Sequence, residues 1–110
     1  MNSATLVLVS TAGPVTTLTL NRPAKRNALN VEFLDQLLAA VAAAENDPRQ
    51  RIMILHGTGP VFCAGLDLAE AADASRAHRS AELIAHLLRA LSGSRLVTIA
   101  AVHGAAMAGG

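Results

Sequence analysis

Two glycine-containing stretches, each following a short apolar run, constrain the fold of this chain most. Residues 62–68 (FCAGLDL) follow the run at 52–55, and residues 102–110 (VHGAAMAGG) follow a run that begins at Val97. Small residues where a strand turns toward a helix leave backbone N–H groups free, and such groups stabilise a developing enolate or tetrahedral oxygen without a catalytic side chain. We interpret the pair as two halves of one oxyanion hole, with simple tight turns as the alternative.

The apolar runs predict an α/β layer that begins with a hairpin. Residues 6–9 and 15–20 are rich in Leu, Val and Thr and are separated by Thr11-Ala12-Gly13-Pro14, which favours an antiparallel pair. The later run at 52–55 has the length and apolar character of a strand covered on both faces, and the run at 97–102 predicts another apolar strand.

Two amphipathic helices are expected between these strands. Asn30 can cap the first helix, and Asp47-Pro48 ends it. The second helix is expected to begin at about Ser80 and to stop at Gly93. We predict residues 69–79 to be a mobile, weakly helical segment over the pocket or an ordinary exposed connector. The apolar residues at helical spacing are Leu34, Leu37, Leu38 and Val41 in the first helix and Ile84, Leu87, Leu88 and Leu91 in the second.

Composition limits the class of protein and its partners. The 110 residues, 52% of them hydrophobic and 15% charged, predict one globular domain. A net charge of +1 and the absence of Trp and Tyr argue against nucleic acid and an anionic membrane as partners. A single cysteine, with no apolar run of membrane-spanning length and no secretory leader pattern, predicts a cytoplasmic protein.

Few side chains are candidates for chemistry. No histidine is placed by sequence to activate Cys63, so we interpret it as a buried, unreactive thiol. Of the four histidines only His103 is near the inferred site, and we expect it to brace the loop by a hydrogen bond. General base and metal ligand are its less favoured roles, because no spacing of His, Cys, Asp or Glu predicts a metal site.

Three segments in order resemble the enoyl-CoA hydratase/isomerase family, also called the crotonase superfamily. They are residues 21–30 (NRPAKRNALN), residues 62–68, and residues 99–104 (IAAVHG) leading into Ala-Gly-Gly. The resemblance implies an α/β crotonase-like β/β/α spiral (ClpP/crotonase fold). Residues 1–110 would be the N-terminal part of one such domain, truncated after the second oxyanion motif, so that the glutamates of hydratases would lie beyond Gly110.

The resemblance also implies roles for individual residues. The backbone N–H groups of Leu66 and Gly109 would bind the thioester oxygen. The basic segment would meet the adenosine end of coenzyme A, although a solvated loop is the alternative, and Asp67 is expected to cap the next helix rather than transfer protons. The positions matched to substrate and coenzyme A are Lys25, Arg26, Ala28, Ala64, Gly65, Asp67, Leu68 and Ala105.

The reaction implied is hydration of a 2-enoyl-CoA to a 3-hydroxyacyl-CoA, with coenzyme A entering only as part of the substrate and no separate cofactor. Isomerase, decarboxylase and thioester hydrolase reactions remain alternatives, as does an inactive fragment that serves as an acyl-CoA-binding or assembly module. A homotrimer or homohexamer is expected. The sequence departs from the family pattern at Ala108 in the glycine run, at Arg95-Leu96 where Lys-Pro is common, and at His103 where asparagine is usual.

Overall fold

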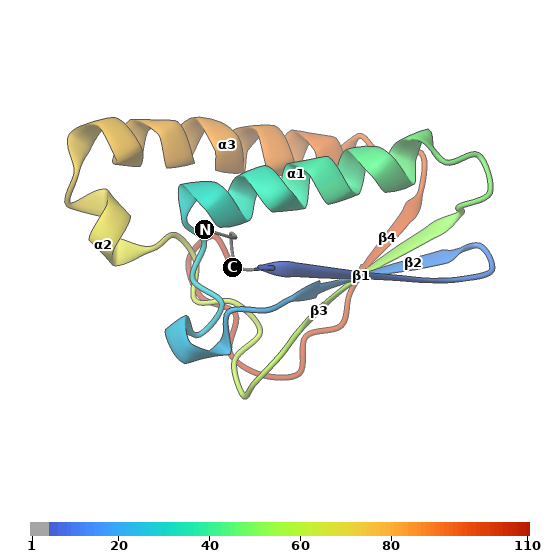
Figure 1. Cartoon of the computed structure of the whole chain (residues 1–110), viewed down its shortest axis with the longest axis horizontal. Helices are drawn as coiled ribbons and strands as arrows, with labels where there is room; N and C mark the ends of the chain where they lie inside the picture. Colours follow the sequence, from blue (N-terminus) through green and yellow to red (C-terminus); the bar gives the residue numbers. More distant parts are fainter. Residues whose placement is uncertain (1–4) are drawn as a thin grey trace.

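The computed structural model describes residues 5–110, which form one mixed four-stranded sheet and its helices. The strands are β1 (Val7–Ala12), β2 (Val15–Leu20), β3 (Ile52–Gly57) and β4 (Val97–Ala100), side by side in the order β1-β2-β3-β4 (Figure 1). β1 and β2 are antiparallel, whereas β3 is parallel to β2 and β4 is parallel to β3. This arrangement confirms the predicted hairpin and α/β layer.

The hairpin turn is tighter than predicted. The register pairs Thr11 with Thr16 and Ala12 with Val15, so only Gly13 and Pro14 remain in the turn. Gly13 has a positive φ of 56°, which a glycine adopts at little cost. At the other end of the sheet, β4 stops at Ala100 rather than at the predicted position 102.

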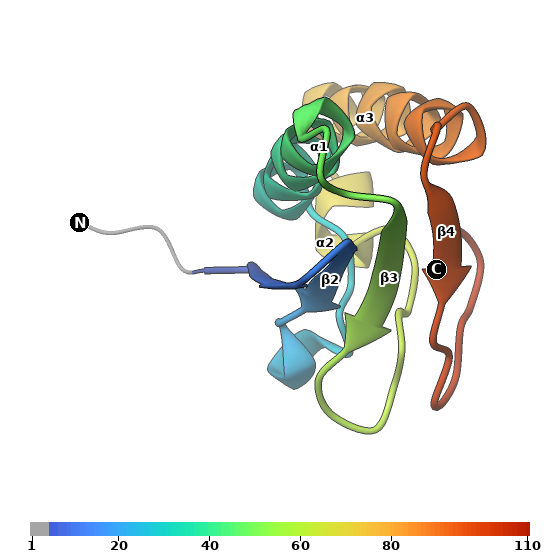
Figure 2. The same ribbon diagram turned by 90° about the vertical axis from the view of Figure 1, so that its right-hand side faces the viewer.

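Two long helices lie on the same side of the sheet, as Figure 2 shows. α1 (Val31–Asn46) begins as predicted, because the Asn30 side chain accepts a hydrogen bond of 2.8 Å from the Phe33 N–H, and it ends before Asp47. α3 (Ala74–Ser92) ends at Gly93, also as predicted. A short 3₁₀ helix, η1 (Pro23–Lys25), and a single-turn helix, α2 (Leu68–Ala71), precede α1 and α3 respectively.

The helical character predicted for residues 69–79 is confirmed, because these residues form most of α2 and the first turns of α3, whereas the connector alternative and the predicted helix start at about Ser80 are wrong. The Asp73 side chain caps α3 by accepting hydrogen bonds from the N–H groups of Ser75 (3.1 Å) and Arg76 (3.2 Å). Arg76 then pairs with Glu32 of α1. Residues 69–79 have no apolar residues at helical spacing, which is the pattern that predicts a helix from sequence. A cap and ion pairs order these residues instead.

The core lies between the sheet and the two helices. β2 alternates in exposure and buries Thr16, Leu18 and Leu20, the pattern of a strand with one face covered. Leu18 of β2 and Phe33 of α1 are among the side chains with no exposed surface, and each such burial contributes about 2 kcal/mol. β4 is exposed along its whole length at the edge of the sheet. No helix within residues 5–110 is both long enough and apolar enough to cross a membrane.

Candidate functional site

The two glycine-containing loops lie against each other. Cys63 and Ala106 form a parallel β-bridge, with the Phe62 N–H donating to the Ala105 carbonyl (2.9 Å) and the Met107 N–H donating to the Cys63 carbonyl (3.0 Å). β3 and β4 are parallel neighbours, so the chains that leave their carboxyl ends continue side by side. The structure therefore brings together the two stretches that the sequence analysis paired.

Gly65 lies in close contact with the second loop. Its φ is +91°, and a Cβ added there would lie 2.8 Å from the Met107 carbonyl oxygen and 3.3 Å from the Gly109 nitrogen. The first distance is shorter than real Cβ contacts, and the φ disfavours any L side chain. Only glycine lets the backbone of the first loop pack directly against residues 107–109.

The Leu66 amide is oriented by a short ladder on its other side. The Leu29 N–H donates to the Gly65 carbonyl (2.8 Å), and the Asp67 N–H donates to the Leu29 carbonyl (2.9 Å). Leu66 lies between Gly65 and Asp67, the two residues of its strand that bond Leu29. In a parallel ladder such a middle residue directs its own N–H to the opposite side, so the Leu66 N–H points away from Leu29. Across residues 5–110, neither this N–H nor that of Gly109 donates a hydrogen bond. Both predicted oxyanion donors therefore lack a hydrogen-bond partner within residues 5–110.

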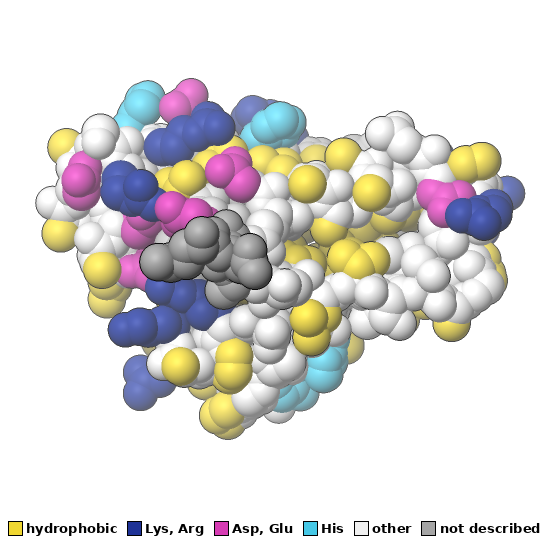
Figure 3. All heavy atoms as spheres, viewed as in Figure 1, with side chains coloured by type: hydrophobic (Ala, Val, Ile, Leu, Met, Phe, Trp, Pro, Cys, Tyr) yellow, Lys and Arg dark blue, Asp and Glu magenta, His cyan; other side chains and the backbone are white. Residues whose placement is uncertain are grey.

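The predicted adenosine-binding residues flank the first loop. The Ala64 N–H donates to the Arg26 carbonyl (3.0 Å), and Ala28 is half-buried beside it. Lys25 and Arg26 are exposed, and in the part of the chain that the structure describes neither side chain has an ion-pair or hydrogen-bond partner. Figure 3 shows basic side chains gathered at the end of the molecule that carries η1. Two cations are thus available next to the loop.

Asp67 is held rather than free to transfer protons. One carboxylate oxygen accepts from the Ala69 N–H (2.8 Å), which is the predicted cap of α2, and the other accepts from Arg22 Nη1 (2.7 Å). The Arg22 hydrogen bond is the main reason that the pKa of Asp67 lies below its ordinary value. Asp67 is therefore an ionised structural acceptor.

The remaining predicted substrate residues do not share one cavity. Leu68 is 86% exposed, and Ala105 contributes its carbonyl to the loop pairing while its side chain faces solvent. An aliphatic cavity of about 210 Å³ lies between α3 and the sheet, with Gly109 at its wall. Its other lining residues are Leu20, Leu29, Leu37, Leu55, Phe62, Cys63, Ile84, Leu87, Leu88, Leu91, Ala100 and Gly110.

Cys63 and His103 occupy the environments expected for them. Cys63 is 2% exposed and its thiol donates to the Asn27 carbonyl (3.3 Å), which confirms that the cysteine is buried. Burial raises the pKa of that thiol, and its low reactivity stays a prediction. His103 Nε2 donates to the Gly59 carbonyl (2.7 Å), and its ring lies 4.9 Å from that of His56. This contact ties the second loop to the turn after β3. Residues 5–110 contain no cluster of three His, Cys, Asp or Glu side chains placed to hold a metal ion.

Asn27 is a residue that sequence reasoning quoted without giving it a role. It has no exposed surface and accepts from the Arg22 N–H (2.8 Å). Its side-chain amide also donates to the carbonyls of Thr58, Val61 and Phe62, so it joins the basic loop to the turn that leads into the first motif. Its residue type in a predicted loop is the sequence signal that could have found it, because asparagine tolerates the positive φ, here 56°, that such turns require.

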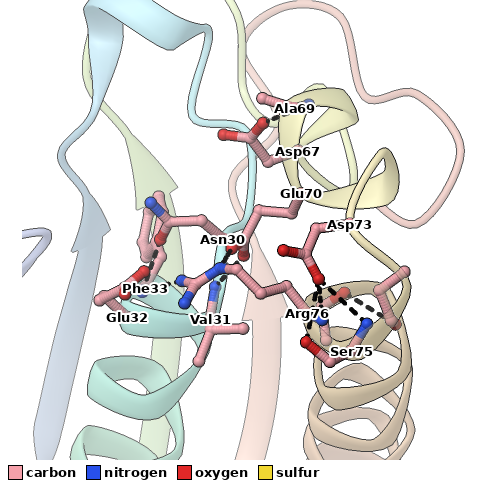
Figure 4. A network of polar contacts seen from close by, with 12 residues as sticks. Asn30, Val31, Glu32, Phe33, Asp67, Ala69, Glu70, Asp73, Ser75 and Arg76 are labelled. Carbon is pink, nitrogen blue, oxygen red and sulfur yellow. Dashed lines mark hydrogen bonds and ion pairs between the residues drawn. The ribbon is translucent and has the colours of Figure 1, made fainter.

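A polar network orders the segment that follows the first loop, as Figure 4 shows. Arg76 of α3 pairs with Glu32 of α1 (2.8 Å) and with the buried Glu70 of α2. Glu70 also accepts a hydrogen bond from the Val31 N–H at the start of α1. The Arg76 hydrogen bond lowers the pKa of Glu32. The network thereby joins three helix starts beside the candidate site.

Known proteins resemble this chain in both sequence and fold. A profile described as enoyl-CoA hydratase/isomerase matches residues 10–110. A probable enoyl-CoA hydratase, EchA14, from Mycobacterium tuberculosis is 39% identical over 107 residues, which cover 94% of this chain and 41% of that protein. The 3-hydroxyisobutyryl-CoA hydrolase 1 of Arabidopsis thaliana is 45% identical over 69 residues, 63% of this chain and 18% of that protein.

A solved structure agrees with the sequence comparisons. The crystal structure of an enoyl-CoA hydratase from Bacillus anthracis superimposes with a TM-score of 0.89 at 28% identity, covering 96% of this chain and 43% of that one. The chain thus spans about two fifths of the length of these two hydratases. The strand order, the two paired loops and these similarities agree, and the chain belongs to the enoyl-CoA hydratase/isomerase family, with the crotonase fold.

Proposed function

We propose that this chain binds an acyl-CoA thioester and stabilises its enolate through the backbone N–H groups of Leu66 and Gly109. The observation that carries the proposal is the close approach of Gly65, the residue before Leu66, to the backbone of residues 107–109, together with the lack of a hydrogen bond from the Leu66 and Gly109 N–H groups among residues 5–110. Loss of one such donor typically costs about 3 to 4 kcal/mol of transition-state stabilisation. Lys25 and Arg26 would meet phosphate groups of coenzyme A, and coenzyme A would be required only as part of the substrate.

Hydration of a 2-enoyl-CoA to a 3-hydroxyacyl-CoA is the reaction that we propose. Relatives named as enoyl-CoA hydratases support it, among them EchA14, which is 39% identical over 107 residues. Neither a general acid nor a general base is assigned to any residue described in the structure. The proposed contribution of this chain is to bind the thioester and stabilise its charge, because the buried carboxylates near the loops among residues 5–110, Asp67 and Glu70, are already paired with arginines.

Thioester hydrolysis is a second candidate. A hydrolase from Arabidopsis thaliana that acts, by its name, on 3-hydroxyisobutyryl-CoA is 45% identical over 69 residues of this chain. The same pair of amides would stabilise the tetrahedral oxygen of hydrolysis as well as an enolate. The acyl-CoA-binding role would be common to both reactions.

The experiment that tests the proposal is a calorimetric titration of the chain with acetoacetyl-CoA, whose enolate resembles the proposed intermediate, with circular dichroism to establish folding. Saturable binding by the folded chain is expected. Free coenzyme A is the matched control ligand, because it keeps the phosphates and lacks the thioester carbonyl, and it should bind more weakly. A folded chain that binds acetoacetyl-CoA no more tightly than coenzyme A would contradict the role of the two amides.

Activity assays separate the two reactions. Hydration removes the conjugated double bond of an enoyl-CoA, which is followed by ultraviolet absorbance, whereas hydrolysis releases a free coenzyme A thiol. Binding without either activity would favour the non-catalytic acyl-CoA-binding module. A homotrimer or homohexamer and a cytoplasmic location complete the proposal, and sedimentation of the protein with and without acyl-CoA measures the first of these.

A further inference from the structure

Arg22 lies between two segments that meet at the first loop. Its Nη1 donates to the Asp67 carboxylate (2.7 Å) and to the Ala28 carbonyl (2.8 Å). The Arg22 side chain is 19% exposed and that of Asp67 is 12% exposed, so solvent screens this ion pair less than it screens a surface pair. Arg22 differs in this from its neighbours Lys25 and Arg26, which are exposed and free of partners among residues 5–110.

The two partners of Arg22 are adjacent to the ladder that orients the Leu66 amide. Ala28 precedes Leu29, and Asp67 follows Leu66, while Leu29 and Leu66 are the bridged pair. Because the bridge is parallel, Arg22 spans this short ladder diagonally, from the residue before the bridged pair on one strand to the residue after it on the other. A peptide flip or displacement at Leu66 would have to break the Arg22–Asp67 contact or the two backbone bonds that Leu29 makes with Gly65 and Asp67.

We propose that Arg22 is a positioning residue, which holds the Leu66 N–H in the direction needed to bind the acyl-CoA oxygen and does not itself touch the substrate. This inference rests on the proposed function, because it assigns a support to one of the two oxyanion donors. It predicts that Arg22 affects the binding of the thioester group and leaves recognition of the coenzyme A phosphates to other residues.

The test compares Arg22→Gln with wild type by amide hydrogen exchange and by calorimetry on the 110-residue chain. The variant should exchange the Leu29 and Asp67 amides about tenfold faster, since a hydrogen bond to a charged group is lost. Its affinity for acetoacetyl-CoA should fall about tenfold, and its affinity for free coenzyme A should not change. A direct phosphate contact by Arg22 would instead weaken both ligands equally, and that result would overturn the proposal.

Two further variants complete the design. Arg49→Gln is the matched control, because it removes an ion pair with Asp47 in which the arginine side chain is 84% exposed, and it should change neither the exchange of Leu29 and Asp67 nor ligand binding. If Arg22→Gln does not fold, Asp67→Asn replaces it. That substitution removes the charge that Arg22 binds and keeps an oxygen to accept from the Ala69 N–H, so faster exchange at Leu29 is again expected.

Each outcome is decisive. Unchanged amide exchange at Leu29 and Asp67 in a folded variant would show that Arg22 does not hold the Leu29–Leu66 ladder, and it would overturn the proposal. Faster exchange with unchanged acetoacetyl-CoA affinity would show a structural contact without a positioning role. A folded wild-type chain that binds no acetoacetyl-CoA would contradict the proposed function, and the positioning role would fall with it whatever the exchange data show.

Discussion

Substitution of Gly65 by alanine tests the central contact between the two loops. The added Cβ would lie 2.8 Å from the Met107 carbonyl oxygen, 3.2 Å from the Ala108 Cβ and 3.3 Å from the Gly109 nitrogen. Two backbone segments cannot yield as a flexible side chain would, so one loop has to move. We expect the second loop to shift and the Gly109 nitrogen to leave its place beside Gly65.

The magnitude is the sum of two physical effects. A non-glycine residue at positive φ costs about 1 to 2 kcal/mol, and overpacking of a close contact costs about 1 to 3 kcal/mol. The free energy of unfolding of Gly65→Ala should therefore fall by about 2 to 5 kcal/mol. Gly13→Ala is the matched control, because Gly13 also has a positive φ, of 56°, but a Cβ there meets nothing within 4 Å. It should lose only the backbone contribution, about 1 kcal/mol.

Urea denaturation followed by circular dichroism measures both variants, and titration with acetoacetyl-CoA measures the site. Gly65→Ala should bind about tenfold more weakly or worse, whereas Gly13→Ala should bind like wild type. The reasoning is refuted if the two variants lose equal stability, or if folded Gly65→Ala retains full affinity. Either result would mean that the loops are not held in the contact described.

Three other predictions concern acid stability, the brace and the thiol. Arginine partners lower the pKa values of Asp67 and Glu32 in the folded chain, so the two ionised carboxylates stabilise the fold at any pH above their ordinary pKa values, near 4. This stability is lost as the pH falls through the lower pKa values of the folded state. In Asp67→Asn the free energy of unfolding should therefore decrease less steeply with falling pH than in wild type, and an unchanged pH dependence would contradict this. His103→Ala should lower the free energy of unfolding, measured by urea denaturation, by about 1 kcal/mol, and His78→Ala, at an exposed position, should lower it by less than about 0.5 kcal/mol. Equal losses would exclude a stabilising contact between His103 and the turn after β3. Cys63 should react with a disulfide reagent only when the chain unfolds, and rapid labelling of the native protein would disprove its burial.

Local sequence determined most of the secondary structure. Asn30 and Gly93 were predicted to bound their helices, and the structure has α1 beginning after Asn30 and α3 ending at Gly93. These signals act over about one helical turn, because a cap satisfies the N–H or carbonyl groups of its own helix end. The sequence predicts the start of α3 at about Ser80 rather than at Ala74, since the order of its first turns depends on the pairing of Arg76 with Glu32, 44 positions away in the chain.

Motifs in the sequence also determined the family, and they named the loops of the candidate site before any geometry was known. They did not determine that Gly65 rests on residues 107–109 or that Arg22 reaches across 45 positions to Asp67. Those contacts required β3 and β4 to be parallel neighbours and residue 29 to bridge residue 66. Strand pairing between distant segments is decided by burial over the whole sheet, so only the tertiary structure could bring the two loops into contact.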